Sequence, residues 1–220
     1  MPFRDRTDAG ERLAAALSKF RNDQCIVYAL PRGGVPVGIE IARALKAPLD
    51  VMLVRKLKAP SQPELALGAI VDGNEPEVII NEAIASRLDP SGDDIKAAAV
   101  EELREIERRR ALYMVEGSNQ TAEGRTAILV DDGIATGATA RAAIAALRRR
   151  NPKRIVLAVP VAPSDVLLEM QAEVDELICL EPQDNFNSVS AFYADFPQVS
   201  DDSVVMLLKQ ARMELAVDRK

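Results

Sequence analysis

Histidine is absent from this 220-residue chain, and only two cysteines occur. Without histidine, no Ser-His-Asp triad, His-ligated zinc site or histidine general base can operate here. Any chemistry must therefore use carboxylates, lysine, arginine, tyrosine, hydroxyls or backbone amides. The cysteines, Cys25 and Cys179, both lie in apolar strand-like runs. We interpret them as buried free thiols in a reducing compartment, rather than as a disulfide or a metal pair.

Long apolar runs are also missing. No run approaches the roughly 18 apolar residues of a membrane span, and residues 1–13 lack the apolar core of a secretory signal. We therefore expect a cytoplasmic protein with no membrane partner. Basic residues number 28 against 34 acidic ones, and the net charge of −6 argues against broad electrostatic binding of nucleic acid. A local basic patch remains compatible with this balance.

The most informative stretch is residues 126–150. Its apolar run Ala127–Val130 ends at two adjacent carboxylates, Asp131 and Asp132, and a loop of mainly small residues then leads into a helix with a basic end. A buried parallel strand reads as a continuous apolar run. Sites in open α/β sheets form at the carboxyl ends of such strands. The two carboxylates are therefore candidate site residues.

The loop after this strand has the properties of an anion site. A helix begins with free backbone N–H groups and the positive end of its dipole, and small residues let an anion approach. Thr136 and Thr139 add hydroxyl donors. With two carboxylates able to accept hydrogen bonds from vicinal hydroxyls, the stretch predicts a pocket for a ribose 5-phosphate. A plain strand–turn–helix is the alternative. No Gly-Lys-Ser/Thr or GxGxxG pattern is present here.

Residues 130–139, VDDGIATGAT, resemble the phosphoribosyl-pyrophosphate (PRPP) motif of type I phosphoribosyltransferases. The resemblance implies that Asp131 and Asp132 are the catalytic carboxylates and hold the ribose hydroxyls. It also implies Mg²⁺, carried mainly by the substrate and assisted by either acid through water. Hypoxanthine-type members have a further Asp where this chain has Ala135, which weakens a 6-oxopurine assignment. The expected 5′-phosphate ligands are Ala135, Thr136, Gly137, Ala138 and Thr139.

Two other segments fit the same resemblance. A predicted strand over residues 25–30 and a predicted helix over 35–46 enclose Arg32, Gly33 and Gly34, which match the position of the family's pyrophosphate loop. A further strand is predicted over 49–54, and Arg55 and Lys56 directly after it are expected to neutralise the pyrophosphate. A plain turn and solvated surface charges are the respective alternatives. Residues 56–65 contain two prolines and are predicted to form a loop, and the resemblance implies that this loop is mobile and covers the site.

Strands alternating with helices predict an α/β fold, with a mostly parallel central sheet flanked by helices. With 48% hydrophobic residues, the chain fits a single domain over 1–220. We place its core at about 24–182 and a small hood at about 1–23 and 181–220. Further helices are predicted over 8–20, begun by an Asp8–Glu11 capping box, and over 81–87, 93–113, 164–172 and 203–217. Further strands are predicted over 67–71, 77–80, 154–160 and 176–180, with Asp72-Gly73 as a hairpin turn.

Aromatic residues concentrate late in the chain. Residues 181–200 hold three of the five phenylalanines. In the family this region and the N-terminal segment select the base, and Phe186 is the best candidate for a stacking ring, with Phe192 and Tyr193 behind it. The alternative is that these rings pack a small satellite core.

The resemblance implies a homodimeric phosphoribosyltransferase that moves the 5-phosphoribosyl group of PRPP to a purine-like or pyrimidine-like base and releases pyrophosphate. An alternative is a non-catalytic, PRPP-sensing regulatory protein with the same fold. A third is hydrolysis or phosphotransfer on another ribose phosphate. The acceptor is not identified by any pattern in the sequence.

Overall fold

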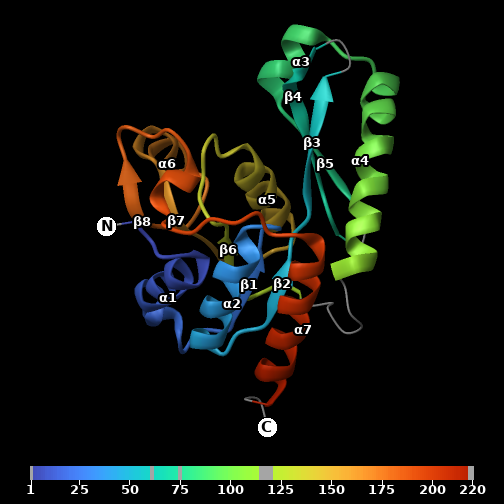
Figure 1. Cartoon of the computed structure of the whole chain (residues 1–220). Coiled ribbons are helices and arrows are strands. Elements are labelled where there is room, and N and C mark those ends of the chain that lie inside the picture. The colour runs from blue at the N-terminus through green and yellow to red at the C-terminus, as the bar shows by residue number, and fades with distance from the viewer. Residues whose placement is uncertain (1, 60–61, 74–75, 114–120, 218–220) are drawn as a thin grey trace.

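The computed structural model describes residues 2–59, 62–73, 76–113 and 121–217, without the side chains of 62–64, 83, 216 and 217. Its centre is a five-stranded parallel sheet with helices on both faces, which confirms the predicted fold class (Figure 1). The strand order is β2 (Leu49–Val51), β1 (Cys25–Ala29), β6 (Thr126–Val130), β7 (Arg154–Pro163) and β8 (Glu176–Gln183).

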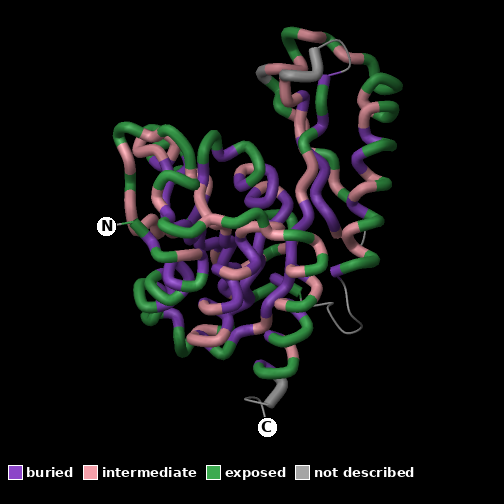
Figure 2. The backbone as a smooth tube through the Cα atoms, viewed as in Figure 1, coloured by how far each residue is buried: buried purple, intermediate pink, exposed green. Residues whose placement is uncertain are grey.

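Successive residues of these strands supply two cores, one on each face of the sheet. In β1, Val27 and Ala29 join the core that contains α1 (Arg6–Ala16), α2 (Gly34–Leu45) and α7 (Asp201–Val217). Ile26 and Tyr28 join the core that contains α5 (Ala138–Arg149) and α6 (Ser164–Met170). Because side chains alternate along a strand, both faces must be apolar, and Figure 2 shows the central strands buried.

Helix α1 begins two residues earlier than the predicted capping box. Asp5 is its N-cap and accepts a hydrogen bond from the N–H of Asp8, so Asp8 lies inside the first turn. The 3₁₀ turn η1 (Ser18–Phe20) follows the helix. Both cysteines are free, as predicted: Cys25 is buried and Cys179 is half-buried. Among the described residues, none of the helices combines the length and apolarity that a membrane span needs.

A second, antiparallel sheet projects from the central domain together with α3 (Glu82–Leu88) and α4 (Gly92–Tyr113) (Figure 1). It consists of β3 (Val54–Ala59), β4 (Gln62–Val71) and β5 (Glu77–Ile80). The expected loop over residues 56–65 is therefore wrong for its described part, although residues 60 and 61 lie outside the described residues. The predicted hairpin is confirmed, because Val71 pairs with Glu77 across the turn.

The reason for the missed strands is tertiary burial. Leu57, Leu67 and Ile70 are fully buried in the same core as Ala99 and Ile106 of α4. Packing against a helix thus outweighs the loop propensity of this segment at Pro63, which lies in β4, and register shifts around Lys58 accommodate the irregular part of the ladder.

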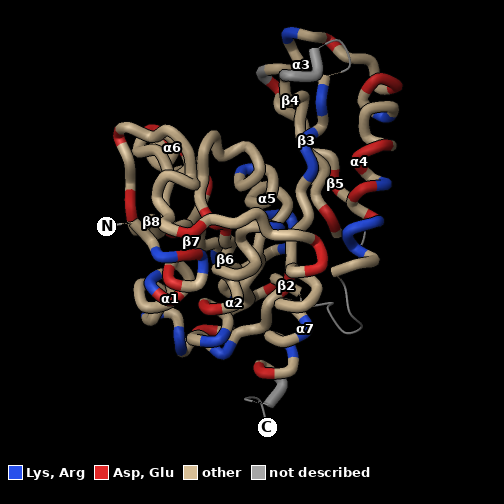
Figure 3. Tube along the Cα trace, viewed as in Figure 1, with Lys and Arg blue, Asp and Glu red and all other residues tan. Residues whose placement is uncertain are grey.

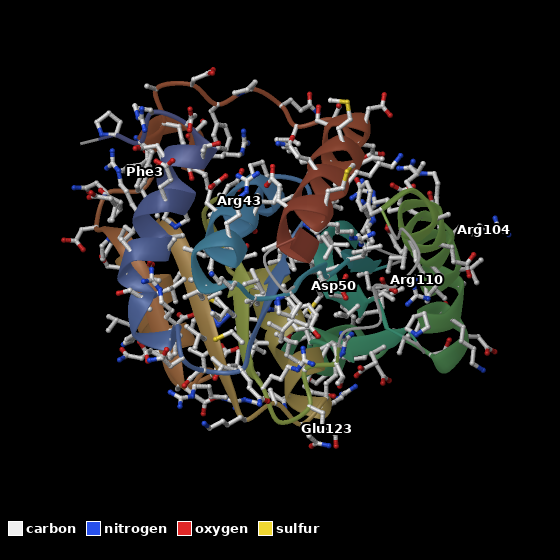
Figure 4. The ribbon with its side chains drawn as sticks, turned by 90° about the horizontal axis from the view of Figure 1, so that it is seen from below. Phe3, Arg43, Asp50, Arg104, Arg110 and Glu123 are labelled. Atoms are coloured by element: carbon white, nitrogen blue, oxygen red, sulfur yellow. The ribbon has the colours of Figure 1, made fainter. Side chains whose placement is uncertain are left out.

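Helix α4 has the predicted salt-bridged face. Arg108 and Arg109 each place Nε 2.7 Å from a carboxylate oxygen of Glu105, and Figure 4 shows Arg104 pointing outward. Figure 3 places the basic residues of β3 beside the acidic residues of α4. Arg110 forms an ion pair with buried Asp72, which fastens α4 to the end of β4.

The N-terminal segment meets the segment that follows β8 beside β7 and β8. The N–H of Phe3 donates to the carbonyl of Phe192 at 2.8 Å, and the N–H of Ala194 donates to the carbonyl of Phe3 at 2.7 Å. Phe192 ends the 3₁₀ turn η2 (Val189–Phe192). Phe3 and Tyr193 are buried in a small third core. These contacts join the two segments that the sequence assigns to the hood.

Candidate active site

Two loops leave the carboxyl edge of the central sheet side by side. Strands β1 and β6 are paired neighbours, with Ala29 opposite Val130, so the segments 30–34 and 131–137 emerge next to each other. After β1 the chain adds β2 on one side of β1, and β6, β7 and β8 follow in order on the other side. This reversal is the topological switch point at which open α/β sheets bind ligands. The two predicted binding loops therefore belong to one site.

Close packing between these loops requires glycine at two positions. A β-carbon on Gly34 would lie 2.7 Å from the carbonyl oxygen of Val130, and one on Gly33 would overlap the carboxylate of Asp132. The peptide bond between Pro31 and Arg32 is cis. The first loop thus lies directly against the acidic residues of the second.

The second loop ends in an exposed helix N-terminus. Gly137 is the N-cap of α5 with φ of 75°, a conformation that favours glycine, and no side chain of the described residues caps this helix. Ala135, Thr136, Ala138 and Thr139 are exposed around it. The first-turn N–H groups and two hydroxyls are therefore accessible to an anion.

The two carboxylates occupy unequal environments. The side chain of Asp131 accepts a hydrogen bond from the N–H of Asp132 at 2.8 Å. Burial, and then the neighbouring charge of Asp132, raise the pKa of Asp131 well above its usual range, with Arg6 opposing the rise. Asp132 instead has a direct cationic partner, because Nε of Arg6 lies 2.7 Å from its Oδ2.

Arg6 from the N-terminal segment and Tyr193 from the segment between β8 and α7 complete this site. The Arg6 and Asp132 side chains are only 10% and 15% exposed. Arg6 also donates to the carbonyl of Pro197 at 2.8 Å, and its guanidinium carbon lies 3.7 Å from the ring centre of Phe196. The Tyr193 hydroxyl donates to the carbonyl of Asp132 at 2.6 Å. Sequence reasoning missed Arg6, which lies 126 positions from Asp132 in a segment that reads as solvated charge.

Comparison with known proteins identifies the family. The model of the phosphoribosyl transferase domain matches residues 5–197. The chain belongs to this family. Proteins from two Mycobacterium tuberculosis strains, CDC 1551 and H37Rv, carry provisional names as phosphoribosyl transferases and are each 42% identical to the chain over 216 residues. The match covers 97% of this chain and 48% of each relative, so the chain spans about half the length of the curated relatives it matches.

Two solved structures share the fold of this chain. The crystal structure of the TT1426 protein from Thermus thermophilus has a TM-score of 0.81 at 37% identity, covering 96% of this chain and 99% of that one. The AQ2163 protein from Aquifex aeolicus, with a TM-score of 0.50 at 10% identity over 83% of this chain and 77% of its own, shares the fold.

The predicted cationic ligands of this phosphoribosyl transferase domain are distributed over three places. Arg32 extends toward the start of α7, with its guanidinium nitrogen 3.7 Å from Oδ1 of Asp201. Arg55 forms an ion pair with Glu102 of α4 at 2.7 Å. The expectation that Arg55 and Lys56 directly follow a central strand is wrong, because β2 ends at Val51 and both residues lie in β3.

Lys56 nevertheless faces the phosphate loop across a cleft. A cavity of about 860 Å³ lies between α5 and the second sheet. Lys56 lines it on the sheet side, and Thr136 and Thr139 line it on the helix side. The second sheet therefore places Lys56 in the same cleft as the predicted 5′-phosphate ligands Thr136 and Thr139, and the expected contact of Lys56 with pyrophosphate stays a prediction. Asp131 and Asp132 do not line this cleft.

Phe186 packs against the small third core and is not an isolated ring at the site. Its ring stacks on Phe192 with centroids 5.8 Å apart and planes at 14°, and both pack partly buried against Phe3 and Tyr193. This arrangement matches the alternative of a satellite core. A contact between Phe186 and a base stays a prediction.

Proposed function

We propose that this domain transfers the 5-phosphoribosyl group of PRPP to a nitrogenous base and releases pyrophosphate. The observation that carries the proposal is the exposed N-terminus of α5, held beside the Asp131–Asp132 pair and the 31–34 loop at one switch point. Backbone N–H groups with Thr136 and Thr139 would bind the 5′-phosphate. The carboxylates would orient the ribose hydroxyls.

The chemistry suits a chain without histidine. The bond from the anomeric carbon to the pyrophosphate oxygen breaks with its electron pair on the leaving group, and a base nitrogen bonds to the same carbon. Pyrophosphate is a good leaving group, so positioning and charge neutralisation supply most of the rate enhancement. The 31–34 loop and Lys56 would hold the departing pyrophosphate, and the acid pair would fix the ribose between the two phosphate sites.

The side chains at the site are suited to a Mg²⁺ ion that is bound mainly by the substrate. No group of three acidic, histidine or cysteine side chains able to hold a metal occurs among the described residues. Asp131 supplies a hard carboxylate oxygen, whereas Oδ2 of Asp132 is already bonded to Arg6. Mg²⁺ usually keeps several waters and binds one or two carboxylates plus substrate phosphates. When bound, Mg²⁺ would neutralise charge on the diphosphate, and Asp131, or Asp132 through water, would help to hold it.

Calorimetric titration with PRPP tests the proposal. We expect binding that strengthens with Mg²⁺ in the wild type and is lost when Asp131→Asn and Asp132→Asn are combined. The exposed acid Asp184→Asn is the matched control and should bind as the wild type does. No wild-type binding at millimolar PRPP would overturn the proposal.

A screen of bases for pyrophosphate release separates the remaining functions. Release with one base supports the transferase. Tight PRPP binding without turnover on any base would favour the PRPP-sensing alternative, and ribose phosphate release without a base would favour hydrolysis. By resemblance to the family we also propose a homodimer, which sedimentation at increasing protein concentration tests.

A further inference from the structure

Arg6 connects the N-terminal segment to Asp132 through one contact and to Phe196 and Pro197 through two more. We propose that Arg6 is a positioning residue, which holds the Asp132 side chain so that the ribose phosphate site is complete only when the N-terminal segment is docked. This inference rests on the proposed function. It assigns a role in substrate binding to Arg6, which contacts Asp132 and not the substrate itself.

The guanidinium of Arg6 is fixed by its surroundings. One N–H reaches Asp132, a second reaches the Pro197 carbonyl, and the plane lies over the Phe196 ring. A nearly buried cation is costly unless it is paired and hydrogen-bonded, so these partners determine where the side chain lies. The neighbouring Arg4 and Arg12 are 74% and 41% exposed and pair with Asp8 instead.

Asp132 is held from three sides, and within the described residues Arg6 is the only cation that forms an ion pair with it. Gly33 lies against its carboxylate, and the Tyr193 hydroxyl bonds its carbonyl. Without Arg6, the carboxylate would lie next to Asp131 with no compensating cation. Two adjacent carboxylates repel each other, so the Asp132 side chain would rotate away from its present position. This rotation would remove an acceptor for a ribose hydroxyl.

The contact between Arg6 and Asp132 is compatible with a bound ribose. Arg6 donates through Nε to Oδ2, and an ionised carboxylate accepts about four hydrogen bonds on its two oxygens. A hydroxyl can therefore bond the same carboxylate while Arg6 stays in place. This geometry favours a supporting role over a blocking one.

Lysine cannot replace Arg6 in this arrangement. The planar guanidinium donates in two directions while its face covers an aromatic ring, whereas a lysine ammonium is a point charge on a flexible stem. The variant Arg6→Lys thus keeps the charge and loses the geometry, and Arg6→Gln loses both. Comparing the two separates positioning from simple charge compensation.

The experiment is calorimetric titration with PRPP and Mg²⁺ at neutral pH, on the wild type, Arg6→Gln, Arg6→Lys and the control Arg12→Gln. We expect both Arg6 variants to bind at least about tenfold more weakly, because misplacement of a substrate-orienting group is costly. Arg12→Gln should bind as the wild type does. If Arg6 supplied only charge, Arg6→Lys would bind as the wild type does, so a loss of binding in both variants supports positioning.

Thermal unfolding of each variant checks that it folds. If the Arg6 variants do not fold, Tyr193→Phe tests whether a contact that holds Asp132 affects PRPP binding. That variant removes only the hydroxyl on the Asp132 carbonyl, and we expect about three- to tenfold weaker binding, the usual effect of one hydrogen bond. Unchanged binding in Arg6→Gln would overturn the inference, and tighter binding would overturn it in favour of a blocking role. If the wild type binds no PRPP, the proposed function fails, and the inference fails with it.

Discussion

Asp50 is a buried acid whose effect on stability can be worked out from its surroundings. It lies in β2, is 7% exposed, and accepts a hydrogen bond from the N–H of Val51 at 2.9 Å. Burial raises its pKa from 3.8 to about 6, the charge of Asp72 adds to the rise, and Arg212 and Arg150 oppose it. Figure 4 shows Asp50 in the interior, between α7 and the elements of the second sheet.

A raised pKa in the folded state means that ionised Asp50 destabilises the protein. As pH rises through 3.8, the unfolded chain loses this proton first, and the penalty grows until the folded-state pKa of about 6 is passed. A difference of about two pKa units, at 1.36 kcal/mol per unit, gives a full penalty of about 3 kcal/mol. The variant Asp50→Asn keeps an acceptor for Val51 and removes the ionisation.

We therefore expect the benefit of Asp50→Asn to depend on pH. Relative to wild type, its free energy of unfolding should rise by about 2 to 3 kcal/mol between pH values near 4 and near 7. Urea unfolding at several pH values in this range measures the difference. Asp89→Asn is the control, since Asp89 is exposed at the left-handed C-cap of α3, where asparagine is tolerated. A difference that does not change with pH would refute this reasoning.

Two predictions concern the site itself. Gly33→Ala should weaken PRPP binding by at least about tenfold, because its methyl group overlaps the Asp132 carboxylate. Gly92→Ala, where no atom lies within 4 Å of the new methyl group, should bind normally in the same titration. Lys56→Gln should raise the dissociation constant of pyrophosphate about threefold or more, as loss of a phosphate contact does, while Lys58→Gln, whose side chain lines a separate cavity against α4, should leave it unchanged. Equal effects of the two lysine variants would contradict the assignment of Lys56 to the cleft.

Local signals in the sequence were sufficient to predict the strands of the central sheet and the two loops that follow β1 and β6. The continuous apolar runs of β1 and β6 predict buried parallel strands, and the glycines and small residues after them mark loops at the carboxyl edge. Since carboxyl ends of neighbouring parallel strands share one edge, the meeting of Gly33 with Asp132 follows from strand order. The alternating pattern of elements predicts a mostly parallel sheet, but the order of its strands was not predicted and comes from the structure.

Features that depend on distant packing were not accessible in the same way. Residues 56–65 are predicted to form a loop, but burial of Leu57 in the same core as α4 places the start of this segment in β3. Arg6 resembles any other charged residue of a helix start until Pro197 and Phe196 fold over it. Periodicity reports which face of an element is apolar, and it carries no information about which distant segment covers that face.

The intramolecular ion pairs at the site differ in strength, and this difference indicates which one a ligand displaces. Arg6 and Asp132 are nearly buried and 2.7 Å apart, whereas Arg32 is 33% exposed and 3.7 Å from Asp201. Asp201 also has Arg108 at 2.9 Å and the Tyr113 hydroxyl as partners, so it stays neutralised if Arg32 leaves. An exposed pair contributes at most about 1 kcal/mol, which a pyrophosphate can readily replace. We therefore expect Arg32 to change partner on PRPP binding while Arg6 stays on Asp132, and a PRPP-bound structure that retains the Arg32–Asp201 pair would contradict this.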